Sequence, residues 1–185
     1  MNQTEVAALR SPAILTNKVS VMVFTGIFSL SFFIPFSLGH PQWLVGTIVN
    51  TCLFLAVIFL PRKFFLPLII FPSLGVLARG VIFGPFTPFL IYFLPFIWLS
   101  NLVLILMFKK LYFSNYFFAI FIASAAKYLF LFAAANTYFK LHFVPAVFLQ
   151  AMGTSQLFTA VTGGIISFIF FKIYGKYFSG NKRAS

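Results

Sequence analysis

Lys127 is the residue of this sequence whose type and position most clearly point to chemistry. It lies in the middle of an apolar run over residues 115–139, about twelve residues or roughly 18 Å from either end of a helix. A lysine side chain hardly reaches water over that distance. The single acidic side chain, Glu5, belongs to the N-terminal tail. The amine must therefore be neutral, be satisfied by polar neighbours, or be balanced by a bound anion. Because an ionisable residue inside a membrane generally marks a functional site, we favour a function for Lys127.

Four amide side chains also interrupt the apolar runs, namely Asn50, Asn101, Asn136 and Gln156. Exposure to lipid is costly for an amide, so each is expected to face the interior of a helix bundle. The alternative to a binding role is an interhelical hydrogen bond, which contributes on the order of 0.6 kcal/mol. Asn50 and Asn136 are expected nearer the outer side, within reach of a solute.

Further candidates lie in the predicted outer loops. Arg79, near the outer mouth, could attract or hold an anion, and the segments 39–43 and 84–89 could form a lid that includes His40 and Trp43. The complete set of predicted substrate-binding residues is Lys127, Asn50, Asn136, Gln156, Arg79, Asn101, Trp43 and His40.

Most enzyme chemistry lacks the residues it needs. One carboxylate excludes a catalytic carboxylate pair, and Cys52, the single cysteine, excludes an iron–sulfur cluster or a thiolate zinc site. No H-E-x-x-H spacing and no G-x-x-x-x-G-K-[ST] phosphate loop occurs. We therefore expect no enzymatic activity, no catalytic residue, no bound metal and no cofactor. A role driven by ATP would need the ATPase of a partner.

The composition indicates a protein embedded in a membrane. The 185 residues are 62% hydrophobic and 8% charged, with a mean hydropathy of +1.05. Backbone groups in lipid must bond internally, and continuous apolar runs without alternation favour helices over a barrel. We predict an all-α bundle of six transmembrane helices over residues 19–173, between a tail of residues 1–18 and a basic tail of residues 174–185. The spans are predicted at 19–38, 43–60, 64–78, 87–108, 115–139 and 145–173.

The basic residues predict how the bundle is oriented. With an internal N-terminus, ten of the thirteen fall on the inner side and two, Arg79 and Lys140, on the outer side. The inner ten are Arg10, Lys18, Arg62, Lys63, Lys109, Lys110, Lys172, Lys176, Lys182 and Arg183. This bias follows the positive-inside rule and predicts that both termini are cytoplasmic. Because the basic residues are dispersed among membrane loops, they indicate orientation rather than nucleic-acid binding.

Small residues indicate which helices meet. Ala119 and Ala123 precede Lys127 at four-residue intervals, and Ala160 and Gly164 follow Gln156 in the same way. Such spacing lets two helix backbones approach closely, so the fifth and sixth helices are expected to pack together. The third span is short and carries two prolines, at positions 67 and 72, which is typical either of a helix that lines a substrate cavity or of a simple kink.

Three segments resemble S-component-type proteins, the substrate-binding membrane subunits of energy-coupling-factor (ECF) transporters. They are PFIWLSN at 95–101, ASAAKYLF at 123–130 and QLFTAVTGG at 156–164, and the similarity covers residues 43–172. The subgroup is often loosely labelled "iron hydrogenase", although one cysteine cannot ligate a hydrogenase cluster. The resemblance implies six helices, cytoplasmic termini, a small-molecule substrate taken from outside, and a shared coupling protein with two ATPase subunits.

Two departures from the family pattern concern partners and substrate. Many S components carry Ala-x-x-x-Ala on the first helix, where the coupling protein docks, and residues 19–38 lack this pattern. Nickel- and cobalt-specific relatives begin with Met-His, whereas this chain begins Met1-Asn2-Gln3. Metal uptake by that route is therefore not expected.

The leading hypothesis is a multi-pass subunit, in the plasma membrane of a prokaryote, that binds a small organic solute for uptake. The solute could be anionic and vitamin-like, with Lys127 supplying charge and Asn50, Asn136 and Gln156 supplying hydrogen bonds. The alternative is a non-transporting subunit of another membrane complex, in which the polar residues only join the helices.

Overall fold

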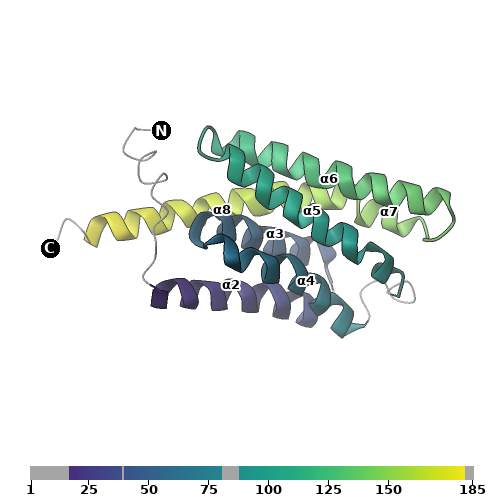
Figure 1. Ribbon diagram of the computed structural model, residues 1–185, viewed down its shortest axis with the longest axis horizontal. Coiled ribbons are helices and arrows are strands. Elements are labelled where there is room, and N and C mark those ends of the chain that lie inside the picture. Colours follow the sequence, from purple (N-terminus) through teal and green to yellow (C-terminus); the bar gives the residue numbers. More distant parts are fainter. Residues whose placement is uncertain (1–16, 39, 81–87, 182–185) are drawn as a thin grey trace.

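All regular secondary structure in the described part of the chain is helical. A computed structural model describes residues 17–38, 40–80 and 88–181, with side chains from 21 to 173. Its elements in chain order are α2 (Asn17–Ser37), α3 (Gln42–Phe59), η1 (Arg62–Phe64), α4 (Phe65–Arg79), α5 (Leu90–Leu111), α6 (Tyr116–Lys140), α7 (Val147–Ala151) and α8 (Thr154–Asn181). Figure 1 shows the long helices running side by side along one axis. No strand occurs within the described residues.

Several of these helices are long and apolar enough to cross a membrane. Among the described residues four segments qualify: α3, α5, α6 and the stretch Val147–Ile173, which includes α7 and most of α8. The described apolar part of α2, Val21–Ser37, is shorter. The 15 residues of α4 span roughly 22 Å, less than the hydrocarbon thickness of about 30 Å. The predicted all-helical class is confirmed, and the chain has the character of a multi-pass membrane protein.

The helix bounds follow the predicted spans except at the C-terminal end. The first five differ by no more than three residues at either end, the largest difference being Leu90–Leu111 against 87–108. The predicted span 145–173 matches the apolar stretch Val147–Ile173, but this stretch is not one continuous helix. The chain breaks between α7 and α8 at Met152 and Gly153, and α8 continues to Asn181. A Cβ at Gly153 would collide with the carbonyl oxygen of Leu149, so glycine permits this tight break.

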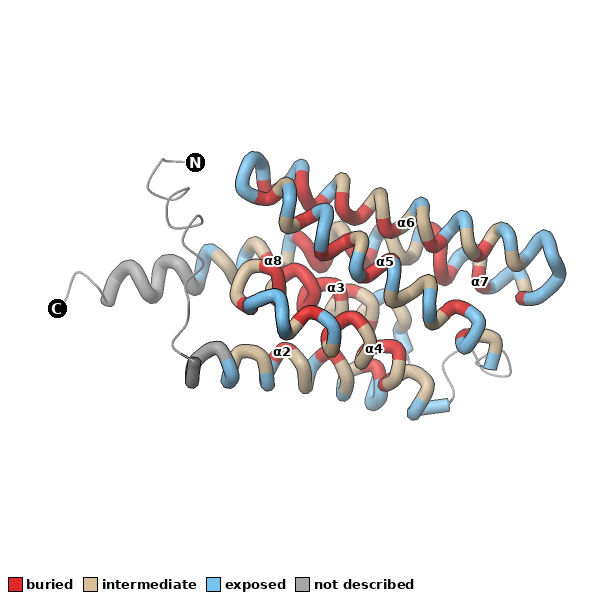
Figure 2. The backbone as a smooth tube through the Cα atoms, in the orientation of Figure 1, coloured by how far each residue is buried: buried red, intermediate tan, exposed pale blue. Residues whose placement is uncertain are grey.

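The helices pack as three close pairs: α5 with α6, α3 with α8, and α2 with α4. Contacts between α6 and α8 join the first two pairs, as the small-residue spacing predicts. Ala119 and Ala123 are fully buried on α6, and a Cβ at Gly164 would lie 2.6 Å from the side chain of Ile120. Figure 2 shows buried residues along the facing sides of the helices and exposed residues on their outer sides. Small side chains thus bring the backbones close together.

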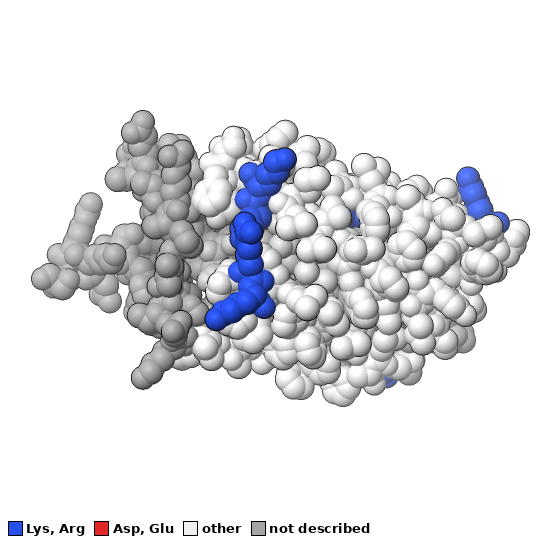
Figure 3. All heavy atoms as spheres, in the orientation of Figure 1, with Lys and Arg blue, Asp and Glu red and all other residues white. Residues whose placement is uncertain are grey.

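The described basic residues gather mainly at one end of the bundle. Figure 3 shows a band of Lys and Arg across that end, where η1 and the end of α5 lie. Arg62 lies close enough to Lys109 for their charges to interact. Arg79 and Lys140 end α4 and α6 at the opposite end. The two groups that the sequence assigns to opposite sides of a membrane therefore lie at opposite ends of the fold, as far as the described residues reach.

Candidate binding site

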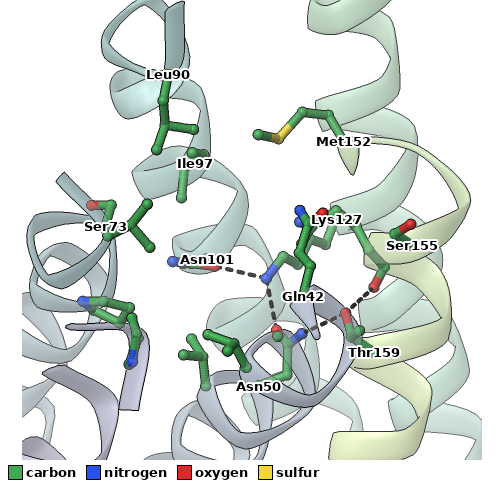
Figure 4. Close-up of a pocket in the computed structure, with 17 residues that line it drawn as sticks. Gln42, Asn50, Ser73, Leu90, Ile97, Asn101, Lys127, Met152, Ser155 and Thr159 are labelled. Atoms are coloured by element: carbon green, nitrogen blue, oxygen red, sulfur yellow. Dashed lines mark hydrogen bonds between the residues drawn. The ribbon is translucent and has the colours of Figure 1, made fainter. Parts of the chain in front are cut away.

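Lys127 is held in the centre of the bundle by two asparagines. Its Nζ donates hydrogen bonds to Oδ1 of Asn50, at 2.7 Å, and to Oδ1 of Asn101, at 2.8 Å. The three residues come from α6, α3 and α5, and each is at most 3% exposed. Figure 4 shows the amine between the two amide groups. Residues far apart in the sequence thus form one buried polar cluster.

The neighbours of each asparagine fix which atom faces Lys127. The Nδ2 of Asn101 donates to the backbone carbonyl of Ile69 at 3.2 Å. The Nδ2 of Asn50 lies 3.2 Å from the hydroxyl of Thr159, which in turn donates to the carbonyl of Gln156 at 3.2 Å. Because a carbonyl can only accept, the amide nitrogen of Asn101 must face Ile69 and its oxygen must face the lysine. The Thr159 hydroxyl donates its one hydrogen to Gln156, so it accepts from the amide nitrogen of Asn50, and the oxygen of Asn50 faces the lysine. Both oxygens are therefore directed at an amine that can only donate to them.

The cluster connects all the principal helices except α2. Asn101 reaches the α4 backbone one turn before Pro72, and the indole of Trp98 donates to the Ser73 hydroxyl at 2.7 Å, which joins α5 to α4 a second time. Asn50 and Thr159 join α3 to α8. Lys127 bonds α3 and α5 directly, and the two asparagines extend these connections to α8 and α4.

A cavity of about 120 Å³ opens beside this cluster. Figure 4 shows several of its polar and apolar side chains around the lysine. Its lining comes from α2, α3, α4, α5, α6, the break before α8 and the first turns of α8. The lining residues are Pro35, Gln42, Val45, Gly46, Val49, Asn50, Pro72, Ser73, Val76, Leu90, Ile97, Asn101, Lys127, Met152, Ser155, Gln156 and Thr159.

The cavity occupies the half of the bundle remote from the basic end. Its lining uses the last turn of α2, the first half of α3, the second half of α4, the first half of α5 and the first turns of α8. The basic end is formed by the opposite ends of α3, α5 and α8. Lys127, near the middle of α6, marks the floor of the cavity.

Three polar groups in the cavity lining have no internal partner in the described part of the chain. Gln42 at the start of α3 and Ser155 at the start of α8 make no hydrogen bond through their side chains there. Gln156 uses its Nε2 to donate to the carbonyl of Ala151 at 3.1 Å, which leaves its Oε1 free. All three residues are half-buried. They offer hydrogen bonds to anything that enters the cavity.

Half of the predicted binding residues meet at this cavity. Lys127, Asn50, Asn101 and Gln156 line it. Asn50 lies deep in the bundle, eight residues into α3.

The other four predicted residues do not line the cavity. Asn136 is half-buried on α6, and Trp43 and His40 are exposed. The guanidinium of Arg79 donates to the backbone carbonyls of Phe36 and Ser37, where it caps the end of α2. Residues 39 and 81–87, which include much of the predicted lid, lie outside the described residues.

Four polar residues of the cavity were not among the predicted binding residues: Gln42, Ser73, Ser155 and Thr159. Thr159 could have been found from sequence, because it lies three residues after Gln156 and so shares its helix face. Gln42 and Ser155 carry no comparable signal, since each stands at a helix start beside a loop. The described residues contain no group of three His, Cys, Asp or Glu side chains that could hold a metal ion.

Comparison with known proteins finds no matching family model, no matching curated protein and no matching solved structure for this chain.

Proposed function

We propose that this chain is a substrate-binding membrane subunit for the uptake of a small organic solute, energised by the ATPases of partner proteins. The observation that carries the proposal is the cavity beside Lys127, with an amine at its floor and unpartnered polar groups on its wall. A membrane protein that needed only to hold its helices together would gain nothing from an internal space lined by free hydrogen-bonding groups. A solute would satisfy them.

The charge distribution supports uptake from outside the cell. If the basic end faces the cytoplasm, as the positive-inside rule expects, the cavity lies in the outer half of the membrane. In this arrangement six helices cross the plasma membrane of a prokaryote and both termini are cytoplasmic. A solute would enter from the outside and come to rest against Lys127.

Energy would come from partners, because the chain has no phosphate-binding loop of its own. The resemblance to S components supports a coupling membrane protein with two ATPase subunits as those partners. The first helix lacks Ala-x-x-x-Ala, so docking would use a different surface from the one many S components use.

Purification of the tagged full chain from its native membranes tests this proposal. We expect a pair of ATPases and a membrane coupling protein to co-purify, and uptake of a solute to depend on ATP. An unrelated tagged membrane protein from the same cells is the control. Recovery within a different complex, without any ATPase, would refute the uptake proposal.

One observation favours the alternative, a non-transporting subunit of another complex. Lys127 already has two hydrogen-bond acceptors inside the protein, so it does not require a solute to be satisfied. In that case replacing Lys127, Asn50 or Asn101 would lower stability, whereas replacing Gln42 or Ser155 would have no effect on any activity of the complex. If the cavity binds a solute, replacing Gln42 or Ser155 weakens that binding.

A further inference from the structure

The charge around Lys127 narrows the class of solute. The two groups that contact its amine are amide oxygens, which solvate an ammonium but carry no charge. The remaining polar side chains of the cavity are Gln42, Ser73, Ser155, Gln156 and Thr159, all neutral. The only carboxylate side chain of the chain, Glu5, belongs to the N-terminal tail. A positive charge here would have no counter-charge among the described residues.

An uncompensated charge in a low-dielectric interior is costly, and a bound anion removes most of that cost. A single cation balances a single negative charge, so a second negative charge on the solute would itself be buried without a partner. A cationic solute would meet a positive group and no carboxylate. On this charge balance, a monoanion fits the cavity better than a dianion or a cation does.

The size and lining of the cavity narrow the class further. Its volume of about 120 Å³ is of the order of a roughly 150 Å³ cavity that admits benzene. Apolar side chains, including Val49, Ile97 and Met152, form much of its wall. The unpartnered Gln42 stands eight residues before Asn50 on α3, which places the two about 12 Å apart along the helix axis. Ser155 stands four residues before Thr159 on α8, about 6 Å away.

We infer that the cavity binds a small monocarboxylic acid about the size of one ring, with its carboxylate against Lys127 and a hydrogen-bonding group at its other end. The second group lies toward Gln42, Ser155 and the Oε1 of Gln156, and the apolar part of the acid contacts Val49, Ile97 and Met152. This inference rests on the proposed function, since it names the solute of the same site.

The first test identifies what the protein itself selects. Small molecules are extracted from the detergent-purified full chain and compared by mass spectrometry between the wild type, Lys127→Met and Lys140→Met. Lys140 ends the same helix and is exposed outside the cavity, so its replacement removes an equal charge without touching the site. We expect a monocarboxylic acid to be enriched in the wild type and in Lys140→Met. In Lys127→Met, which lacks the positive charge at the floor of the cavity, we expect the acid to be depleted at least about tenfold.

Lys127→Gln separates charge from folding, because its amide still donates hydrogen bonds to Asn50 and Asn101 but carries no charge. In a titration with the denaturing detergent sodium dodecyl sulfate, we expect this variant to unfold at nearly the same concentration as the wild type. We nevertheless expect it to lose the acid. Retention of the acid by Lys127→Gln would overturn the charge argument. An enriched neutral or cationic molecule would overturn the inference and leave the uptake proposal standing.

A second test uses named probes and decides the case in which no molecule co-purifies. The thermal midpoint of the purified protein is measured with 4-hydroxybenzoate, 4-hydroxybenzamide and benzoate. We expect 4-hydroxybenzoate to stabilise the protein most, the amide to bind at least about tenfold more weakly because it lacks charge, and benzoate to be weaker because it lacks the remote hydroxyl. Stabilisation by the amide equal to that by the acid would refute the inference. Failure of all three, together with an empty extract, would also refute the inference, whereas the uptake proposal is decided separately by the co-purification of ATPases.

Discussion

Replacement of Gly163 by alanine should separate the two helices that position Asn50. A Cβ at Gly163 would lie 2.8 Å from the backbone nitrogen of Thr51, 2.9 Å from the Cβ of Asn50 and 2.9 Å from the carbonyl oxygen of Thr47. Two of these three neighbours are backbone atoms, and none can rotate away. Helices α3 and α8 must therefore move apart.

The size of the effect follows from these distances. Ordinary van der Waals contact begins at 3.4 Å, so relief of the 2.8 Å contact needs a shift of 3.4 − 2.8 = 0.6 Å. A shift of that size along the 3.2 Å bond between Asn50 and Thr159 would lengthen it to about 3.8 Å, beyond a hydrogen bond. Forcing an extra methyl group into packed helices costs about 1–3 kcal/mol. Alanine also favours the helix over glycine by about 1 kcal/mol, which partly hides the cost.

Gly26→Ala is the matched control, because a Cβ at Gly26 in α2 meets nothing within 4 Å. This variant gains the same helix propensity from alanine but has no steric clash. Unfolding of both variants by sodium dodecyl sulfate in mild detergent gives their free energies of unfolding. We expect Gly163→Ala to be less stable than Gly26→Ala by about 1–3 kcal/mol. Equal changes in the two variants would show that α3 and α8 do not approach as closely as described.

Three further predictions concern other contacts of the bundle. Asn101→Leu leaves the Ile69 carbonyl and one N–H of the Lys127 amine without a partner. It should therefore lower the free energy of unfolding by about 1–3 kcal/mol in the same titration. An unchanged free energy of unfolding would show that Asn101 does not hold this cluster together. Tyr116→Phe removes the 2.8 Å hydrogen bond to Ser167 between α6 and α8, and should cost about 0.5–1.5 kcal/mol. If that bond is the cause, the same change in a Ser167→Ala background should cost much less. Cys52 is 3% exposed, so a maleimide should label it only after denaturation, whereas Leu141→Cys in a Cys52→Ser background should be labelled at once because position 141 is exposed.

The helices were predictable from the sequence because apolar runs and their flanking charges are local signals. The break at Gly153 was not found, since a glycine in an apolar run is common in membrane helices and nothing nearby requires a break. The structure shows the reason in three dimensions, because the Leu149 carbonyl occupies the space of a side chain at Gly153. The short α4 was expected from the run of apolar residues between Arg62–Lys63 and Arg79.

The polar cluster was predictable only in part. Lys127 stands out because a lysine in the middle of an apolar run has no local explanation. Its partners are not local: Asn50 lies 77 residues away and Asn101 lies 26 residues away. Hydropathy indicates that each amide faces inward but not which amides meet, so Asn136, expected nearer the outer side, looked a better candidate than Asn101. Arg79 looked like an anion-binding residue, yet its hydrogen bonds go to the end of α2, a contact that depends on how α2 and α4 pack.

Native mass spectrometry of the purified full chain tests the central claim, that the cavity beside Lys127 holds a small solute. Val49→Phe fills space in the cavity lining, and Val21→Phe adds the same volume at a position that is 53% exposed. We expect the wild type and Val21→Phe to carry an additional small mass, or to take one up from a cell extract, and Val49→Phe to appear as the bare chain. A bare chain in all three proteins, or an additional mass that Val49→Phe retains in full, would contradict a solute site at this cavity.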